Sequence, residues 1–150
     1  MKRLIACGCV LAVMAMAGVL AGRQDPIAVS PEYTEWYIAG DVGEVVGYQR
    51  IPMTNMTIYR SQYGNTGEFP VDALGVSRCY LATRIDLQEI LQCENARILH
   101  ASEIASGTVY TCYAKQDYPS VTLDGQAVNM QIACVGDKIW VGIPMLMGSY

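Results

Sequence analysis

The sequence predicts a mainly β protein with one short helix, built as a β-sandwich or small barrel, stabilised by disulfides and preceded by a signal peptide. Three observations predict this class. Short runs of β-branched and aromatic residues alternate with Gly, Asn, Asp and Pro, a pattern typical of strands joined by turns. A single segment carries a helix-capping pattern. An uncharged apolar stretch follows a basic N-terminus, as in exported proteins.

The first 21 residues have the layout of a secretory signal peptide. Lys2 and Arg3 form a basic start, and residues 4–21 form an uncharged apolar stretch that ends in small residues. We expect cleavage after Ala21, because polar residues follow at 23–26. The stretch of 18 residues also reaches the lower limit for a membrane-spanning helix. The expected location is therefore periplasmic or secreted, and the alternative is a domain anchored in the membrane by residues 4–21.

Chain length and charge limit the domain count and the partners. At 150 residues the chain is about one domain long. We expect an extended lead-in or linker at 22–35, which contains two prolines, and a single β-rich domain at 36–150. The formal net charge is −4, and it becomes −6 without the two basic residues of the first segment. Because nucleic-acid binding needs clustered Lys and Arg, nucleic acid is not an expected partner.

Short strand-like runs fill the first half of the domain. Residues 36–39, 45–48 and 53–59 are rich in β-branched and aromatic residues, and a loop of turn formers follows at 63–70. The glycine-rich segment 40–47 matches no phosphate-binding motif, and it lacks a lysine and a following helix. We therefore expect it to connect two strands.

The helix candidate begins after Asp86. Asp86 and Glu89 have the spacing of a capping box, and Leu87, Ile90 and Leu91 form a short apolar face, which places a helix at 87–94. The next segment, 96–105, fits either more helix or a strand. Residues 108–115 have the composition of a strand.

Two turn signals in the C-terminal third predict an antiparallel three-stranded meander. Asp124-Gly125 and Gly136-Asp137 are both typical of two-residue hairpin turns. Tight turns at both places give registers that agree with each other, and a slip of one residue would turn the apolar set to solvent. The shared face then holds Val121, Leu123, Val128, Met130, Ile132, Cys134, Ile139, Val141 and Ile143. Cys134 is therefore expected to point into the core.

Four cysteines follow the predicted signal peptide: Cys79, Cys93, Cys112 and Cys134. An even set in an exported domain predicts two disulfides, each typically worth about 2–4 kcal/mol. Three pairings are possible. We expect Cys112–Cys134, which lie on two different predicted strands, and Cys79–Cys93, which lie on a strand-like run and near the end of the helix.

Few residues offer catalytic or metal-binding chemistry. His100 is the single histidine, so any Ser-His-Asp or Cys-His arrangement would have to use it. It lies in an apolar run, where a half-buried structural role is the usual one. The chain after the signal segment has no Cys-x-x-Cys pair and no calcium-binding loop. We predict no catalytic residue, no metal, no cofactor and no enzymatic activity, with a hydrolase that uses His100 as one alternative.

The aromatic residues point to a binding surface. Ten Tyr and two Trp accompany a single Phe, so most rings carry a polar group, which suits surfaces that are half apolar and half wet. Tyr and Trp are also enriched at binding hot spots. The candidate binding surface is Trp36, Tyr37, Tyr48, Tyr59 and Tyr63. The alternative is that tyrosine serves only as a good strand former in a half-exposed sheet.

One strand resembles a known family. Tyr110-Thr111-Cys112, followed by Val121–Gly125, is similar to the exported bacterial lysozyme inhibitors, which combine a Tyr-x-Cys strand with a small β-barrel. The Ser-Gly loop that such inhibitors use against lysozyme has no counterpart after that strand, because Ser106-Gly107 precedes it. The resemblance implies a role as an inhibitor, and the segment 63–70 would be its rigid loop.

Together these observations predict an exported binding or structural module of the cell envelope, an accessory component of a bacterial surface or secretion assembly. Its partner would be a protein or a glycan in the envelope or the extracellular space. The alternatives are a secreted or periplasmic inhibitor of a wall-degrading hydrolase such as lysozyme, and the hydrolase that uses His100.

Overall fold

The computed structural model describes residues 26–61 and 73–147. The predicted signal peptide or anchor and the predicted loop at 63–70 lie outside these residues. The strands and the helix are β1 Tyr33–Ala39, β2 Tyr48–Pro52, β3 Met56–Ser61, β4 Gly75–Leu81, α2 Leu87–Cys93, β5 Ala96–Ile104, β6 Gly107–Ala114, β7 Val121–Leu123, β8 Gln126–Val128, β9 Met130–Val135 and β10 Lys138–Ile143. The described segments contain no helix with the length and apolarity needed to cross a bilayer.

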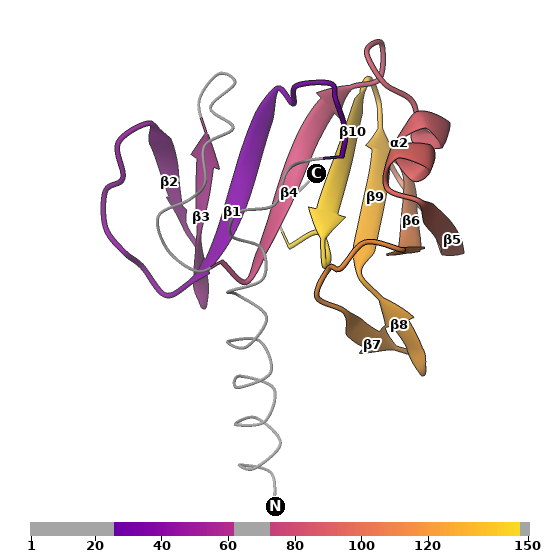
Figure 1. Ribbon diagram of the computed structural model, residues 1–150. Coiled ribbons are helices and arrows are strands. Elements are labelled where there is room, and N and C mark those ends of the chain that lie inside the picture. Colours follow the sequence, from indigo (N-terminus) through magenta and orange to yellow (C-terminus); the bar gives the residue numbers. More distant parts are fainter. Residues whose placement is uncertain (1–25, 62–72, 148–150) are drawn as a thin grey trace, which may run out of the picture.

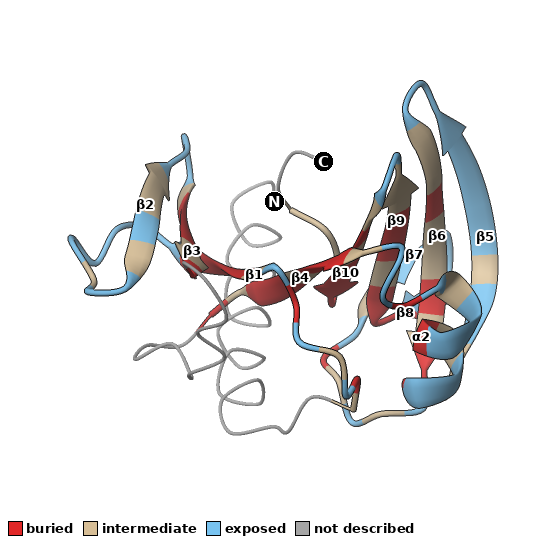
Figure 2. Ribbon diagram, turned by 90° about the horizontal axis from the view of Figure 1, so that it is seen from above, coloured by how far each residue is buried: buried red, intermediate tan, exposed pale blue. Residues whose placement is uncertain are grey.

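Eight of these strands form one antiparallel sheet, in the order β2-β3-β1-β4-β10-β9-β6-β5, and β7 and β8 form a separate hairpin. The mainly β class with one short helix is confirmed. The sandwich or small barrel is not, because the sheet of the described residues has two open edges, β2 and β5. The sheet is strongly twisted: β5 and β6, foreshortened in Figure 1, run along the page in Figure 2.

The two faces of the sheet differ in chemistry, because successive side chains of a strand point to opposite sides. One face, here the helix face, carries the main apolar core and is covered by Ile90, Leu87 and Leu91 of α2. Its strand residues include Trp36, Tyr59, Val76, Tyr80, Met130, Ile132, Ile139, Val141 and Cys112. The other face, here the polar face, carries the residues between them, such as Glu35, Tyr37, Ser77 and Cys79. Burial is greatest in the central strands (Figure 2).

The predicted capping box and helix are confirmed. The Asp86 side chain accepts a hydrogen bond from the Glu89 backbone N–H at 2.9 Å, and the Glu89 side chain accepts one from the Asp86 N–H at 2.9 Å. The ambiguous segment that follows is the strand β5, which pairs with β6 along its length. Strand pairing therefore decides a conformation that local propensity leaves open.

The two C-terminal hairpins have the predicted registers, but they do not form one continuous meander. Val121 pairs with Val128, and Ile132 pairs with Val141. The expected middle strand is interrupted at Asn129, which is buried. The Asn129 side-chain oxygen accepts a hydrogen bond from the Ala114 N–H at 2.7 Å, and its side-chain nitrogen donates one to the Ala114 carbonyl at 2.9 Å. Beyond that point β9 pairs with β6 and β10. Cys134 packs against the core, as expected.

The N-terminal strands begin at positions different from those expected. β1 starts at Tyr33, inside the expected lead-in, and the residues before it pack on the sheet: Ile27 is 4% exposed, and the Glu32 N–H donates to the Cys79 carbonyl at 2.7 Å. β2 starts at Tyr48, where its apolar run ends, and β3 starts at Met56, three residues after the start of its run. The glycine-rich segment 40–47 connects β1 and β2, as predicted.

Candidate functional site

The predicted aromatic surface is largely core. Trp36, Tyr37 and Tyr59 are 8%, 1% and 0% exposed, Tyr48 is half-buried, and Tyr63 lies outside the described residues. The two buried tyrosine hydroxyls are hydrogen-bonded: that of Tyr59 donates to the Gly43 carbonyl at 2.8 Å, and that of Tyr37 donates to Glu35 Oε2 at 3.2 Å. Trp36, Tyr37 and Tyr59 therefore form no exposed patch, because all three rings are buried.

Neither expected disulfide is present, and all four cysteines are free thiols. Cys112 lies opposite Met130, whereas Cys134 lies opposite Thr108. The two cysteines are thus offset by four residues, about 13 Å at roughly 3.3 Å per residue, and a disulfide needs Cα atoms within about 7 Å. Cys79 is buried on the polar face, whereas Cys93 is exposed at the end of α2 on the helix face. Sequence spacing alone cannot give these registers.

His100 lies on β5, exposed to solvent and opposite Thr111. A β-bulge separates it from Ile98 on the same strand. Among the residues that the structure describes, no three His, Cys, Asp or Glu side chains come together as a possible metal site.

A hydrogen-bonded network of charged and hydroxyl side chains lies on the polar face. Arg60 donates to Glu35 Oε1 from Nε at 2.8 Å and from Nη2 at 2.6 Å. The Tyr37 hydroxyl donates to Glu35 Oε2 at 3.2 Å and lies 2.8 Å from Ser77 Oγ. The network joins β3, β1 and β4 side by side.

Aromatic contacts extend this network toward β10. The Arg60 guanidinium lies 4.6 Å from the centre of the Tyr33 ring, and Trp140 Nε1 donates to the Tyr33 hydroxyl at 3.1 Å. Burial raises the pKa of Tyr33 to about 12 and that of Tyr37 further still. Because Glu35, Tyr37 and Ser77 are almost fully buried, the network is closed to a ligand and its role is to hold the strands together.

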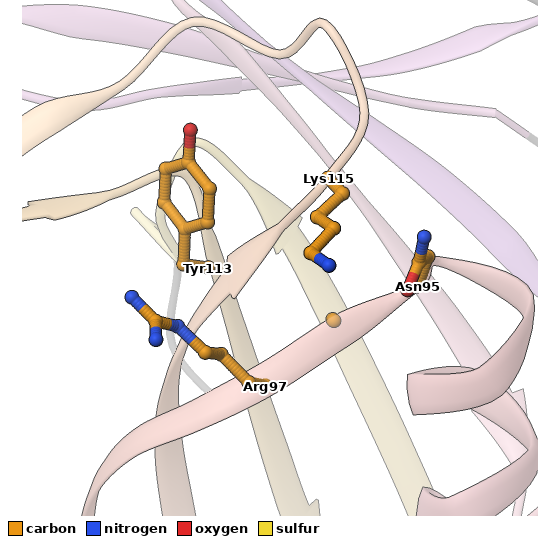
Figure 3. A pocket seen from close by; sticks show the side chains of 5 residues that line it. Asn95, Arg97, Tyr113 and Lys115 are labelled. Atoms are coloured by element: carbon orange, nitrogen blue, oxygen red, sulfur yellow. The ribbon is translucent and has the colours of Figure 1, made fainter.

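An open pocket of about 420 Å³ lies at the other end of the sheet, lined by Asn95, Ala96, Arg97, Tyr113 and Lys115 (Figure 3). Arg97 pairs with Tyr113, and the Lys115 N–H donates to the Asn95 carbonyl at 3.1 Å. These pairings bring the ends of β5 and β6 together on the polar face. Figure 3 shows Arg97 and Tyr113 at one end of the pocket, with Lys115 and Asn95 at the other.

The turn from α2 into β5 positions the pocket. Glu94 caps the helix, and Asn95 takes a left-handed conformation, with φ 48°, before the strand begins. Asn tolerates this region better than most residues. The Asn95 N–H donates to the Gln92 carbonyl at 3.1 Å. The end of the helix thus fixes where the pocket amide and the first residues of β5 lie.

The pocket is positively charged on an acidic protein. Neither Arg97 nor Lys115 forms an ion pair with a carboxylate of the described residues, among which Arg50 pairs with Asp41 and Arg60 with Glu35. Two carboxylates lie close in sequence to these cations: Glu94 is buried and accepts a hydrogen bond from the Tyr118 hydroxyl at 2.7 Å, and Asp117, two residues after Lys115, is exposed. Guanidinium and ammonium groups bind carboxylates and phosphates through charge-assisted hydrogen bonds. The arrangement is therefore suited to an anion.

The pocket lies beside the longer open edge of the sheet. β5 has nine residues, most of them exposed, and Ile98 and Ile104 are 40% and 38% exposed. No strand of the described residues pairs with its outer side. The other edge, β2, has five residues and ends at Pro52, which cannot donate a backbone hydrogen bond.

Sequence reasoning missed the pocket. Arg97 and Lys115 are far apart along the chain and belong to no motif. The one usable signal was the strand alternative for 96–105, because a hairpin with the predicted strand 108–115 would bring a cation from each segment to the end away from the turn. Comparison with protein-family models, curated proteins and solved structures finds no match to this chain.

Proposed function

We propose that this protein is an exported, non-enzymatic binding module of the cell envelope that takes up a strand of a partner protein at the open edge of β5. The observation that carries the proposal is the length and exposure of this edge, nine residues with no described strand outside it. Such an edge presents unpaired backbone donors and acceptors that an extended segment can pair with.

The two edges differ in ways that favour β5. β2 is short, ends at Pro52, and carries Arg50, which is ion-paired with Asp41 of the preceding loop. β5 keeps a regular run from His100 to Ile104 after its bulge, and its exposed Ile104 offers apolar contact. Short, proline-containing edges resist strand addition, whereas long exposed edges invite it.

Export is proposed from the N-terminal sequence alone. The basic start and the apolar stretch at 4–21 support a periplasmic or secreted location, either free after cleavage or anchored. In that compartment the module would serve as an accessory component of a surface or secretion assembly. The intact mass of protein purified from its native compartment tests this, because a mass that includes Met1 contradicts cleavage.

Site-specific photo-crosslinking in the native host tests the binding edge. A photoreactive residue at Ser102 of β5 is compared with one at Thr122 of β7, since both positions are exposed. We expect a partner adduct from Ser102 and none from Thr122. Ile104→Lys should reduce the adduct, whereas Leu123→Lys, at a residue of similar exposure, should not. Equal adducts from both positions, or none from Ser102, contradict the proposal.

A further inference from the structure

We infer that the pocket formed by Asn95, Arg97, Tyr113 and Lys115 binds the carboxylate of an acidic residue in the partner segment that pairs with β5. The inference rests on the proposed function and names the chemistry of the partner: an extended peptide with an Asp or Glu at one end of the paired stretch and an apolar residue at the other.

The charge of the pocket selects a carboxylate. Arg97 and Lys115 lie at opposite ends of one pocket, and neither pairs with a carboxylate of the described residues. The planar guanidinium of Arg97 can donate hydrogen bonds to both oxygens of a carboxylate. The Lys115 ammonium adds a second positive charge, and the Asn95 side-chain amide adds a hydrogen-bond donor. The Tyr113 ring forms an apolar wall for the methylene groups of the acidic side chain.

The position of the pocket selects a peptide paired with β5. A strand added to an edge lies about 4.8 Å outside it, and side chains directly across the pair have Cβ atoms roughly 5 Å apart. A side chain opposite Arg97 on the polar face therefore lies within reach of its guanidinium. Lys115, one strand further in, borders the same pocket.

The β-bulge of β5 fixes the spacing of the partner's residues. Arg97 pairs with Tyr113 and Ile104 pairs with Gly107. Tyr113 and Gly107 are six residues apart on a regular strand, so they share the polar face. Their partners Arg97 and Ile104 therefore share that face as well, although they are seven residues apart, because the bulge adds one residue to β5. A regular partner strand thus places an acidic residue and an apolar residue six positions apart on the face toward the pocket.

Titration of the isotopically labelled protein with two synthetic peptides tests the inference by nuclear magnetic resonance. The probe is a nine-residue peptide of alternating residues, Thr at the odd positions, Val at the second, fourth and sixth and Glu at the eighth, with blocked ends, so that antiparallel pairing sets Glu against Arg97 and the first Val against Ile104. The matched peptide has Gln in place of Glu. We expect the Glu peptide to bind about tenfold more tightly at low salt, with amide shifts at 95–97, at 113–115 and along 100–104.

Charge variants assign this preference to the pocket. The double variant Arg97→Gln/Lys115→Gln should bring the Glu peptide to the affinity of the Gln peptide, whereas Arg84→Gln, at an exposed arginine outside the pocket, should leave the tenfold difference in place. Unchanged spectra away from the pocket show that the variants fold.

The outcomes separate the inference from the function on which it rests. Equal affinity for the two peptides, with shifts along 100–104, overturns the carboxylate site and supports strand pairing. A preference for Glu with shifts at the pocket but none along 100–104 overturns the strand-pairing function. Binding of neither peptide at millimolar concentration overturns the inference, as does a charge preference that survives in the double variant.

Discussion

Replacing Glu35 with alanine tests whether the polar-face network stabilises the sheet. Its side chain is 5% exposed and accepts two hydrogen bonds from Arg60 and one from Tyr37. Removing one partner of a buried ion pair costs about 3–5 kcal/mol. Because the Arg60 side chain is 36% exposed and can turn to water, we expect the loss to be lower, about 2–3 kcal/mol once solvent screening is included.

Urea unfolding followed by tryptophan fluorescence measures this loss. The reporters Trp36 and Trp140 lie on opposite faces of the sheet, and Trp140 bonds to Tyr33 at the edge of the network. With a denaturant slope of about 2 kcal/mol per molar, the urea midpoint should fall by about 1 M. The urea midpoint of Glu35→Gln should fall by less, because glutamine keeps the side-chain volume and one acceptor oxygen.

Two comparisons make this prediction refutable. Glu103→Ala removes an exposed carboxylate that bonds to the Thr108 hydroxyl, and a surface change of this kind should cost less than about 0.5 kcal/mol. A double-mutant cycle of Glu35→Ala with Arg60→Met should show a coupling of about 1 kcal/mol or more. The reasoning fails if Glu35→Ala costs no more than Glu103→Ala, or if the two changes in the cycle are additive.

Three further predictions concern the helix cap and the thiols. Asp86→Ala removes half of the capping box and should lower the free energy of unfolding by about 1 kcal/mol, measured by urea unfolding. Under native conditions a maleimide should label the exposed Cys93 rapidly and the buried Cys112 only after unfolding, as peptide mass mapping would show. Burial raises the pKa of the Cys112 thiol from 9.0 to about 12. The unfolded chain therefore loses this proton first, and stability should fall as the pH rises from about 9 toward about 12.

Each of these predictions has a result that contradicts it. An unchanged urea midpoint in Asp86→Ala would show that the cap contributes nothing. A cysteine peptide that stays unlabelled after unfolding without reductant would reveal a disulfide. For the pH dependence, midpoints at about pH 8 and about pH 10.5 are compared between the natural chain and Cys112→Ala. The variant should lose less stability, and an equal loss would exclude Cys112 as a source of the decline.

The candidate pocket shows why the site was harder to predict than the elements around it. Both of its strands were considered from the sequence, one of them as an alternative to helix. The cations Arg97 and Lys115 meet only because β5 pairs with β6 in a register that sets Arg97 against Tyr113. That register follows from the two-residue turn at 105–106 and the β-bulge after Ile98, neither of which the sequence pattern predicted.

The sequence by itself determined the features that depend on neighbouring residues. The capping box of Asp86 and Glu89, the hairpin turns at 124–125 and 136–137, and the alternation that turns Cys134 toward the core all involve groups a few residues apart. Their physical basis is local hydrogen bonding and backbone geometry. The residues that make these interactions can therefore be recognised from the local sequence, although packing against the sheet stabilises them.

Only the tertiary structure decided the features that depend on distant residues. Pairing with β6 made residues 96–104 a strand, and the two hydrogen bonds between Asn129 and Ala114 ended the expected meander. Coverage of both faces of β1 placed Trp36 and Tyr37 in the core instead of on a binding surface. Strand order and register follow from which surfaces bury one another, because one apolar pattern is compatible with several pairings.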